Sequence, residues 1–147
     1  MSGALHLIKL CVGIDSVDHM ADRLKFRLAQ NRLNNLPMET GHVTRMWPKR
    51  SDELLDGGSL YWVIKGQVQL RQTILALDEQ IGQDGIRRCK IRLNPELMRT
   101  TPQPRRPFQG WRYLAGADAP NDLGLYREGE DTMPAEMQSH LAALGVI

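Results

Sequence analysis

The sequence has few of the features that identify secreted or membrane proteins. Its 147 residues include two cysteines, Cys11 and Cys89, which are too few for a disulfide-stabilised scaffold. No segment approaches the roughly 20 consecutive apolar residues of a membrane-spanning helix. The apolar start is interrupted by Lys9 and lacks the basic region and cleavage site of a signal peptide. We therefore expect a cytoplasmic protein that does not enter the membrane, folded as a single domain over residues 1–147.

Motifs for metal, cofactor or catalytic chemistry are also missing from the sequence. The four histidines lie too far from one another and from the cysteines for a zinc motif: His6, His19, His42 and His140. There is no phosphate-binding loop, dinucleotide fingerprint or nucleophile elbow. Gly57 and Gly58 precede a predicted strand instead of a helix, so they favour a tight turn over a phosphate site. We expect no metal and no cofactor, assign no catalytic residue, and favour a binding domain over an enzyme.

Charge is distributed unevenly along the chain, although the net charge is +2. Residues 1–22 carry a net charge of −2 and residues 113–147 carry −5, whereas residues 23–112 hold seventeen basic and eight acidic residues, a net charge of +9. Arginine outnumbers lysine by 14 to 5, and its planar guanidinium group matches phosphate and stacks on aromatic rings. The basic centre weakly indicates polyanion binding, and the alternative is a solvated charged surface.

Apolar spacing predicts one strand and one helix at the start of the chain. Residues 6–12 are short, apolar and β-prone, as in a buried strand. Asp15 or Ser16 can cap a following helix that runs to about residue 33. Its apolar face is formed by Val17, Met20, Ala21, Leu24 and Leu28. Phe26 lies on the opposite face, which indicates either a second contact or one exposed ring.

The centre of the sequence is rich in predicted strands. We expect strands at residues 41–46, 59–65, 67–77 and 86–93, with one helical turn within residues 50–56. Gly66 separates the second and third strands as a hairpin turn or a bulge. Alternation predicts one continuous core beneath the first helix, formed by Leu60, Trp62, Ile64, Val68, Leu70, Ile74, Cys89 and Ile91. Cys11 and Cys89 both fall on core faces and are interpreted as buried structural thiols.

Prolines dominate the next segment. The three prolines within residues 100–110 predict an extended, exposed loop, after which residues 112–114 could re-enter the sheet. Residues 118–130 are acidic and predicted to be irregular. Pro134 begins a last helix with an apolar stripe formed by Met133, Met137, Leu141 and Leu144. The resulting fold class is α+β, with a mixed or antiparallel sheet, a helix at each end, and closure into a small barrel as a variant.

Aromatic and basic residues occur together in the centre of the chain, an arrangement typical of single-stranded nucleic-acid sites. Trp62 alternates with core residues and is expected to be buried, whereas Trp47 and Trp111 lie in predicted loops where core packing and ligand contact are equally plausible. Nine residues form the predicted nucleic-acid-binding site: Arg45, Trp47, Lys49, Arg50, Lys65, Arg105, Arg106, Trp111 and Arg112. We expect Arg45, Lys49 and Arg50 to share one concavity with at least one of the last three arginines.

The segments HLIKLCVG, HVTRMWPKR, GGSLYWVIKG, LRQTIL and RRPFQGWRYL carry a family resemblance. The chain resembles, over nearly its whole length, the small bacterial proteins of domain-of-unknown-function family 1489. The resemblance implies no particular activity.

A weaker resemblance concerns the fold. The order of basic loop, helical turn, Gly57-Gly58, strand, Gly66 and strand is similar to domains of the PUA, ASCH and EVE type. Those domains are small pseudo-barrels that bind RNA or modified bases, so this likeness implies a PUA-like barrel wall along residues 61–65.

Our leading hypothesis is a domain that binds RNA or a nucleotide and has no chemistry of its own. The first alternative is a small hydrolase or base-processing enzyme that uses His42 or Asp56 in the same cleft. The second is a protein-interaction module that docks through the loop from Pro102 to Pro107, since proline-rich extended segments suit that mode. The sequence sets neither the ligand nor the oligomeric state.

Overall fold

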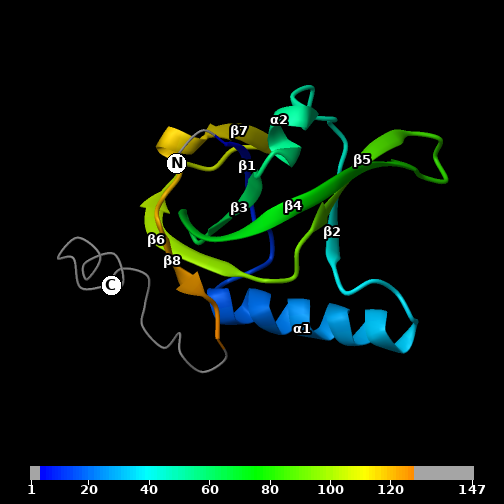
Figure 1. Ribbon diagram of the computed structural model, residues 1–147, viewed down its shortest axis with the longest axis horizontal. Helices are drawn as coiled ribbons and strands as arrows, with labels where there is room; N and C mark the ends of the chain where they lie inside the picture. The colour runs from blue at the N-terminus through cyan, green and yellow to red at the C-terminus, as the bar shows by residue number, and fades with distance from the viewer. Residues whose placement is uncertain (1–3, 128–147) are drawn as a thin grey trace.

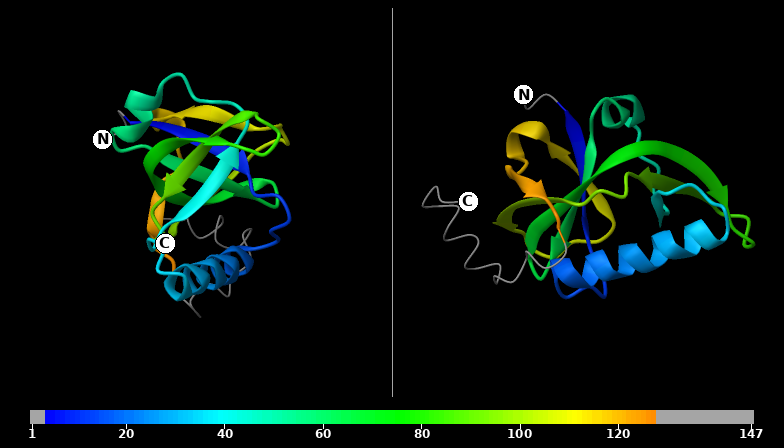
Figure 2. Two further views of the ribbon diagram at one scale, coloured as in Figure 1. Left: turned by 90° about the vertical axis from the view of Figure 1, so that its right-hand side faces the viewer. Right: turned by 60° about the horizontal axis from the view of Figure 1, so that its bottom comes forward.

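The computed structural model describes residues 4–127, and the predicted C-terminal helix after Pro134 lies outside them. The described chain is α+β, as expected, with a mixed eight-stranded sheet and two α-helices. α1 lies along one side of the sheet and the short α2 lies on the opposite side (Figures 1 and 2). No helix in this part of the chain is long and apolar enough to cross a membrane.

The N-terminal elements follow the prediction closely. β1 spans Leu5–Leu10 and α1 spans Val17–Leu33. Ser16 caps α1, because its hydroxyl accepts a hydrogen bond from the backbone N–H of His19 at 3.0 Å. Val17 is the buried residue of α1, and the Phe26 ring is 68% exposed. α1 therefore covers the sheet loosely, with its apolar face only partly buried.

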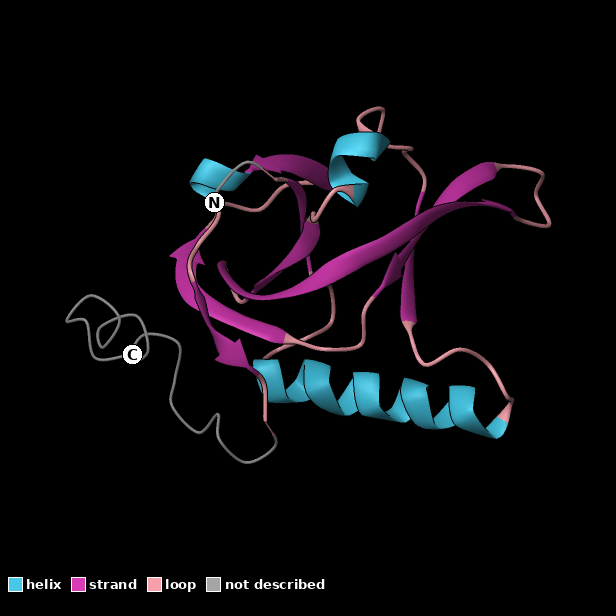
Figure 3. Ribbon diagram, viewed as in Figure 1, coloured by secondary structure: helices cyan, strands magenta, loops and turns pink. Residues whose placement is uncertain are grey.

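The central strands form the body of the sheet (Figure 3). Their bounds are β2 Thr40–Thr44, α2 Ser51–Leu55, β3 Ser59–Ile64, β4 Gln67–Ile81 and β5 Arg87–Leu93. The order is β2-β5-β4-β3-β1-β7, and β4 also pairs with β6, which pairs with β8. β1 and β3 are parallel, and the other pairs between described strands are antiparallel.

The sheet does not close into the barrel that the PUA-like comparison implied. β2 and β7 stand at the two ends of the strand order and share no ladder. Side chains connect these ends instead: the Trp111 indole N–H donates to the Met46 carbonyl at 3.0 Å, and the Tyr113 hydroxyl accepts from the Arg50 backbone N–H at 3.1 Å. The observed architecture is a strongly curved open sheet whose two edges are joined by side chains.

The first part of the proline-rich segment, up to Pro104, is a strand, which corrects the prediction of an exposed loop there, whereas residues 105–110 are irregular as predicted. β6 spans Met98–Pro104 and pairs with β4 and β8, and both Thr100 and Pro102 are buried. The pairing with β4 shifts register between Val68 and Leu70, which leaves an irregular stretch of β6 around Pro102. A bulge tolerates proline because the ladder is already interrupted there.

The segment after β6 is also more regular than expected. β7 spans Trp111–Ala115, a 3₁₀ turn spans Gly116–Asp118, and β8 spans Asp122–Leu125. The prediction of an irregular segment from residue 118 is therefore wrong over β8. Arg71 of β4 holds β8 in place, because its guanidinium group donates to both carboxylate oxygens of Asp122 at 2.7 and 2.8 Å.

The core is divided between two clusters instead of being continuous. Seven of the eight predicted core residues lie in the larger cluster, with Trp62 only 4% exposed. Val68 belongs to the smaller cluster, together with Ile8 and Tyr61. A β-bulge at Gln69 changes the alternation, because Val63 pairs with Val68 whereas Trp62 pairs with Leu70. Cys89 is fully buried as predicted, whereas Cys11 follows β1 and is only half-buried.

Candidate ligand-binding site

Five of the nine predicted site residues lie where the segment after β2 meets β7. We define the Trp47–Trp111 surface as Arg45, Trp47, Lys49, Arg50 and Trp111. Trp111 fixes the edge of the sheet through its bond to the Met46 carbonyl, and its ring meets that of Tyr113 edge to face at 4.9 Å. This indole therefore contributes to the fold in addition to being half-exposed.

Neighbouring groups already engage much of the Trp47–Trp111 surface. The guanidinium group of Arg87 lies over the Trp47 ring, 4.3 Å from its centroid. Arg50 forms two hydrogen bonds with Glu53, which raise the pKa of the Arg50 guanidinium and lower the pKa of the Glu53 carboxyl. Arg45 and Lys49 are exposed. Ligand contact at this surface is thus left chiefly to two flexible cations.

The other four predicted residues lie on a different side of the sheet. Lys65 occupies the β3–β4 turn, and the backbone N–H of Arg105 donates to the neighbouring Gly66 carbonyl at 2.8 Å. Arg112 lies over Phe108, which packs on the smaller core cluster, whereas Trp111 packs on the larger one. Arg106 is exposed in the segment between them. Side chains of β7 alternate between faces, so Arg112 and Trp111 point to opposite sides.

Ion pairs reduce the effective charge of the basic centre. Five of its arginines bind carboxylates of the described chain at 2.5–2.7 Å. They are Arg50, Arg71, Arg87, Arg88 and Arg92. Several pairs are largely exposed, so they reduce the local positive potential more than they stabilise the fold. The charge run at residues 23–112 is thus in part the solvated surface that the sequence left open as an alternative.

A deeper site lies between α1 and the sheet. We call it the His42 cavity; its volume is about 730 Å³, within the range of small-molecule sites. Strand residues His42, Trp62, Gln72 and Thr40 contribute the more buried part of the lining. α1 contributes the exposed side chains of the rim. The loose covering of the sheet by α1 thus creates the cavity.

The inner wall of the His42 cavity is a fixed set of polar and aromatic groups. The Trp62 indole N–H donates to the Gln72 side-chain oxygen at 3.0 Å. The Gln72 amide donates in turn to the Asn94 carbonyl at 2.9 Å, and it also contacts the Thr40 hydroxyl at 3.4 Å. The His42 ring meets the Trp62 ring edge to face at 5.3 Å. These bonds hold the wall in one orientation before any ligand arrives.

His42 has an unsatisfied polar atom at this wall. Its Nε2 is the one buried side-chain nitrogen or oxygen without a hydrogen-bond partner among residues 4–127. Burial, together with the charges of Lys9 and Arg27, lowers the pKa of His42 from 6.5 to about 4. The imidazole is therefore neutral at pH 7, with one nitrogen as donor and the other as acceptor. Buried polar atoms rarely lack a partner, so this nitrogen is a natural contact for a ligand.

Basic residues surround this neutral histidine. Lys9 of β1 pairs in register with Trp62, and its side chain lines the cavity. Arg23 and Arg27 of α1 line the exposed rim, and Arg27 donates to the Gly41 carbonyl at 3.3 Å. Asp22 is the one acidic residue among the described residues of the lining. The balance of charge favours an anionic ligand.

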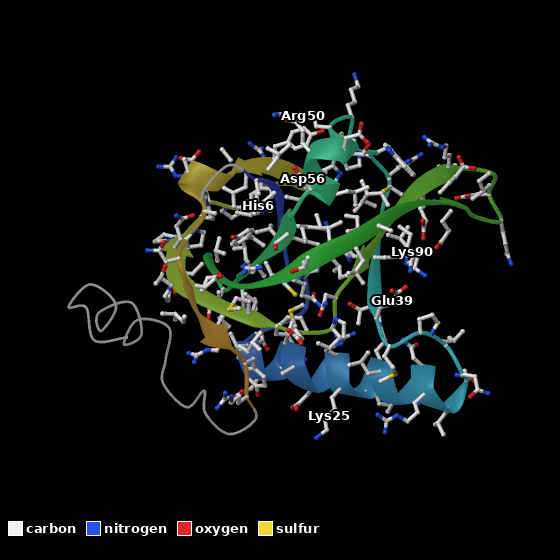
Figure 4. All side chains as sticks on the ribbon, in the orientation of Figure 1. His6, Lys25, Glu39, Arg50, Asp56 and Lys90 are labelled. Carbon is white, nitrogen blue, oxygen red and sulfur yellow. The ribbon has the colours of Figure 1, made fainter. Side chains whose placement is uncertain are left out.

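Thiol, metal and acid–base chemistry have little support in the described chain. Burial raises the pKa of the Cys11 thiol to about 11, and the thiol contacts the Met20 sulfur at 3.6 Å. No group of three metal-ligating side chains occurs in residues 4–127. Asp56, which the enzyme hypothesis named as the alternative to His42, lies beside α2 near Arg50, on the opposite side of the molecule from Lys25 of α1 (Figure 4). Asp56 is therefore not among the described residues that line the cavity at His42.

His6, by contrast, has a structural role. Its Nδ1 accepts a hydrogen bond from the Ser59 backbone N–H at 2.9 Å, and its ring packs edge to face on Tyr61. Burial and the charge of Arg71 lower the pKa of His6.

Sequence analysis considered His42 but missed the other polar residues of the cavity. Lys9 could have been identified from the sequence, because a lysine within an apolar strand is unusual. Arg23 and Arg27 are four residues apart and therefore share a helix face. The sequence could not show that this face lies opposite His42, because that depends on the parallel pairing of β1 with β3.

Comparisons with known proteins identify a family but no solved structure of similar fold. Neither the curated proteins nor the solved structures include a match, so no structural neighbour supports the PUA-like comparison. A family model described as "Protein of unknown function (DUF1489)" matches residues 7–147. The match includes the strands, α1 and the lining of the His42 cavity. The chain therefore belongs to the DUF1489 family.

Proposed function

We propose that this protein binds a nucleotide unit in the His42 cavity, either as a free nucleotide or as part of single-stranded RNA, and performs no chemistry on it. The observation that carries the proposal is the buried, unpartnered Nε2 of His42 in a cavity with a basic rim. A ligand with hydrogen-bonding ring edges and an anionic group satisfies both features at once.

The rim suits phosphate. Arg23 and Arg27 are exposed side chains on one face of α1, and Lys9 faces them from β1. Guanidinium groups bind phosphate through paired N–H donors, and an ammonium group adds a compact charge. With Asp22 as the one acidic lining residue, the local charge favours a ligand with one or two negative charges.

The inner wall suits a planar base. Aromatic rings and convergent polar groups are what proteins use to bind unstacked bases. Trp62 and His42 provide the rings, and neutral His42 can donate to or accept from a base edge. Because Gln72 already holds the Trp62 indole, little ordering is required when the ligand binds.

Catalysis has weaker support than binding. The one carboxylate of the lining, Asp22, lies on the exposed rim, and the Cys11 thiol is protonated at neutral pH. Among residues 4–127, no acid–base pair faces the position that a ligand would occupy beside His42.

The Trp47–Trp111 surface is a second candidate position for RNA. It is favoured by the exposed cations Arg45 and Lys49 beside two half-exposed indoles. It lies near α2 and not beneath α1, so variants can separate the two positions.

Matched double variants test the proposal. Arg23→Gln/Arg27→Gln removes the charge of the cavity rim, and Arg45→Gln/Lys49→Gln removes two charges from the Trp47–Trp111 surface. Binding would be measured by anisotropy with a labelled single-stranded oligoribonucleotide at several salt concentrations, and by calorimetry with each ribonucleoside monophosphate. Thermal unfolding checks that Arg27, which contacts the Gly41 carbonyl, is dispensable for folding.

We expect the rim variant alone to lose most of its affinity. The slope of log affinity against log salt concentration should fall by about 0.7 for each phosphate contact to a single strand that is lost. Binding of monophosphates indicates a free nucleotide, and binding of the oligomer alone indicates RNA. Loss of affinity in the surface variant alone would move the site to the Trp47–Trp111 surface. Absence of binding to both probes at low salt would refute the proposal.

A further inference from the structure

A second hollow lies along the other side of α1. We call it the α1 groove; its volume is about 540 Å³. Its apolar lining includes Leu24 and Leu28 of α1, Met38, Leu97 and Leu125. Met38 and Leu125 are 43% and 47% exposed, unusually high for apolar side chains that line a hollow. Such an apolar groove beside an incompletely packed helix is suited to an amphipathic helix.

The described chain ends at this groove. The backbone N–H of Tyr126 donates to the Leu97 carbonyl at 2.8 Å, and the Tyr126 hydroxyl donates to Asp18 at the start of α1 at 2.7 Å. Tyr126 itself lines the groove. The twenty residues after Arg127 therefore begin beside an apolar surface, and any segment among them has a very high local concentration there.

The sequence of those twenty residues complements the groove. Met133, Met137, Leu141 and Leu144 recur at the spacing of one helix face. The stripe spans twelve residues, from Met133 to Leu144, and the part of α1 that lines the groove, from Ala21 to Arg32, also spans twelve. At about 1.5 Å per residue, both lengths are roughly 18 Å.

Charge allows a further contact at two positions of the groove. Residues 128–147 carry four acidic residues and no lysine or arginine, and α1 presents Lys25 and Arg32 along the groove, whose described lining also includes the acidic residues Asp22 and Glu96. Five residues, 128–132, are available to lead from Arg127 into the groove. They contain three of the four acids.

We propose that residues 133–144 dock in the α1 groove of their own chain as an amphipathic helix. Their four apolar residues cover Leu24, Leu28 and Leu97 and complete the packing of α1. This inference does not rest on the proposed ligand, because the groove and the His42 cavity share only Asp22 and Leu24 among their described lining residues.

Methyl NMR of the full chain tests the docking. With labelled Met and Leu methyl groups, we expect NOEs between the Met137 methyl and the methyls of Leu28. A Met137→Glu/Leu141→Glu variant should lose the corresponding NOEs from the unchanged Met133 and Leu144 methyls to the groove, and should speed amide exchange in α1. The matched control Ala135→Glu/Ser139→Glu adds the same charge on the opposite helix face and should keep both.

Two outcomes would overturn the proposal. The first is a full-length protein without NOEs between residues 133–144 and the α1 groove. The second is NOEs that appear solely between differently labelled chains in a mixed sample, which would assign the groove to a second copy of the protein. If the Met137→Glu/Leu141→Glu variant fails to fold, the wild-type NOEs still decide between these outcomes.

Discussion

Replacement of His42 tests the electrostatics of the cavity. The fold keeps His42 neutral, because burial and the charges of Lys9 and Arg27 lower its pKa from 6.5 to about 4. In the unfolded chain the same imidazole takes up a proton at about pH 6.5. Its contribution to stability is therefore fully present above pH 6.5 and is lost as the pH falls towards 4. His42→Asn removes this titration while keeping a polar side chain.

The magnitude follows from the size of the pKa shift. At about 1.4 kcal/mol per pH unit, lowering the pKa from 6.5 to about 4 corresponds to roughly 3 kcal/mol. The ring is partly exposed, so solvent screens some of the effect and we expect about 2 kcal/mol. Wild-type protein should lose that much more stability than His42→Asn between pH 7 and pH 4.

Urea unfolding monitored by tryptophan fluorescence at half-unit steps of pH measures this difference. His6 also has a lowered pKa and contributes with the same sign, but it is present in both proteins and cancels in the comparison. Parallel stability curves for wild type and His42→Asn would refute the reasoning. A direct NMR titration that places the His42 pKa near 6.5 would refute it equally.

Three further substitutions test the packing. Trp62→Ala removes a 4%-exposed indole and its hydrogen bond to Gln72, and should cost about 3–5 kcal/mol in chemical denaturation. Gly58→Ala places a methyl group against two backbone carbonyl oxygens that no side-chain rotation can move, so we expect a loss of about 3 kcal/mol or an insoluble protein. Arg71→Gln removes the paired hydrogen bonds to Asp122 and should cost about 1 kcal/mol, with faster amide exchange in β8.

Local chemistry made much of the fold predictable. Ser16 caps α1, and Lys65 and Gly66, both with positive φ, form the tight turn of the β3–β4 hairpin. Glycine adopts that conformation without steric cost, which is why its position between two apolar runs predicted the turn. The alternation of Leu60, Trp62 and Ile64 identified a core strand, because every second side chain of a strand points to the same face of the sheet.

Features set by pairing between distant segments were not predictable. The bulge at Gln69 moves Val68 to the smaller core cluster, and nothing in the apolar pattern of β4 indicates an extra residue. Pro102 suggested a loop, but the irregular pairing of β6 accommodates it within a strand. In both cases the partner strand decides the geometry, and the partner is invisible in a local window of sequence.

The candidate site illustrates the same limit. Arg112 and Trp111 are neighbours in sequence and so appeared to belong to one surface, yet strand alternation sends them to opposite faces. Lys9 and His42 are 33 positions apart and are connected through Trp62, which pairs with Lys9 and whose ring meets that of His42. Sequence proximity was thus a poor guide to the cluster that surrounds the cavity.

Nitrogen-15 NMR of the His42 imidazole tests the central claim most directly. The claim is that a nucleotide unit makes a hydrogen bond to the buried Nε2 that has no partner within the described chain. On addition of ribonucleoside monophosphates or a short single-stranded RNA at pH 7, we predict a shift of the His42 Nε2 resonance, together with the Trp62 indole signal. An unchanged His42 resonance, with shifts confined to Trp47 and Trp111, would contradict the account.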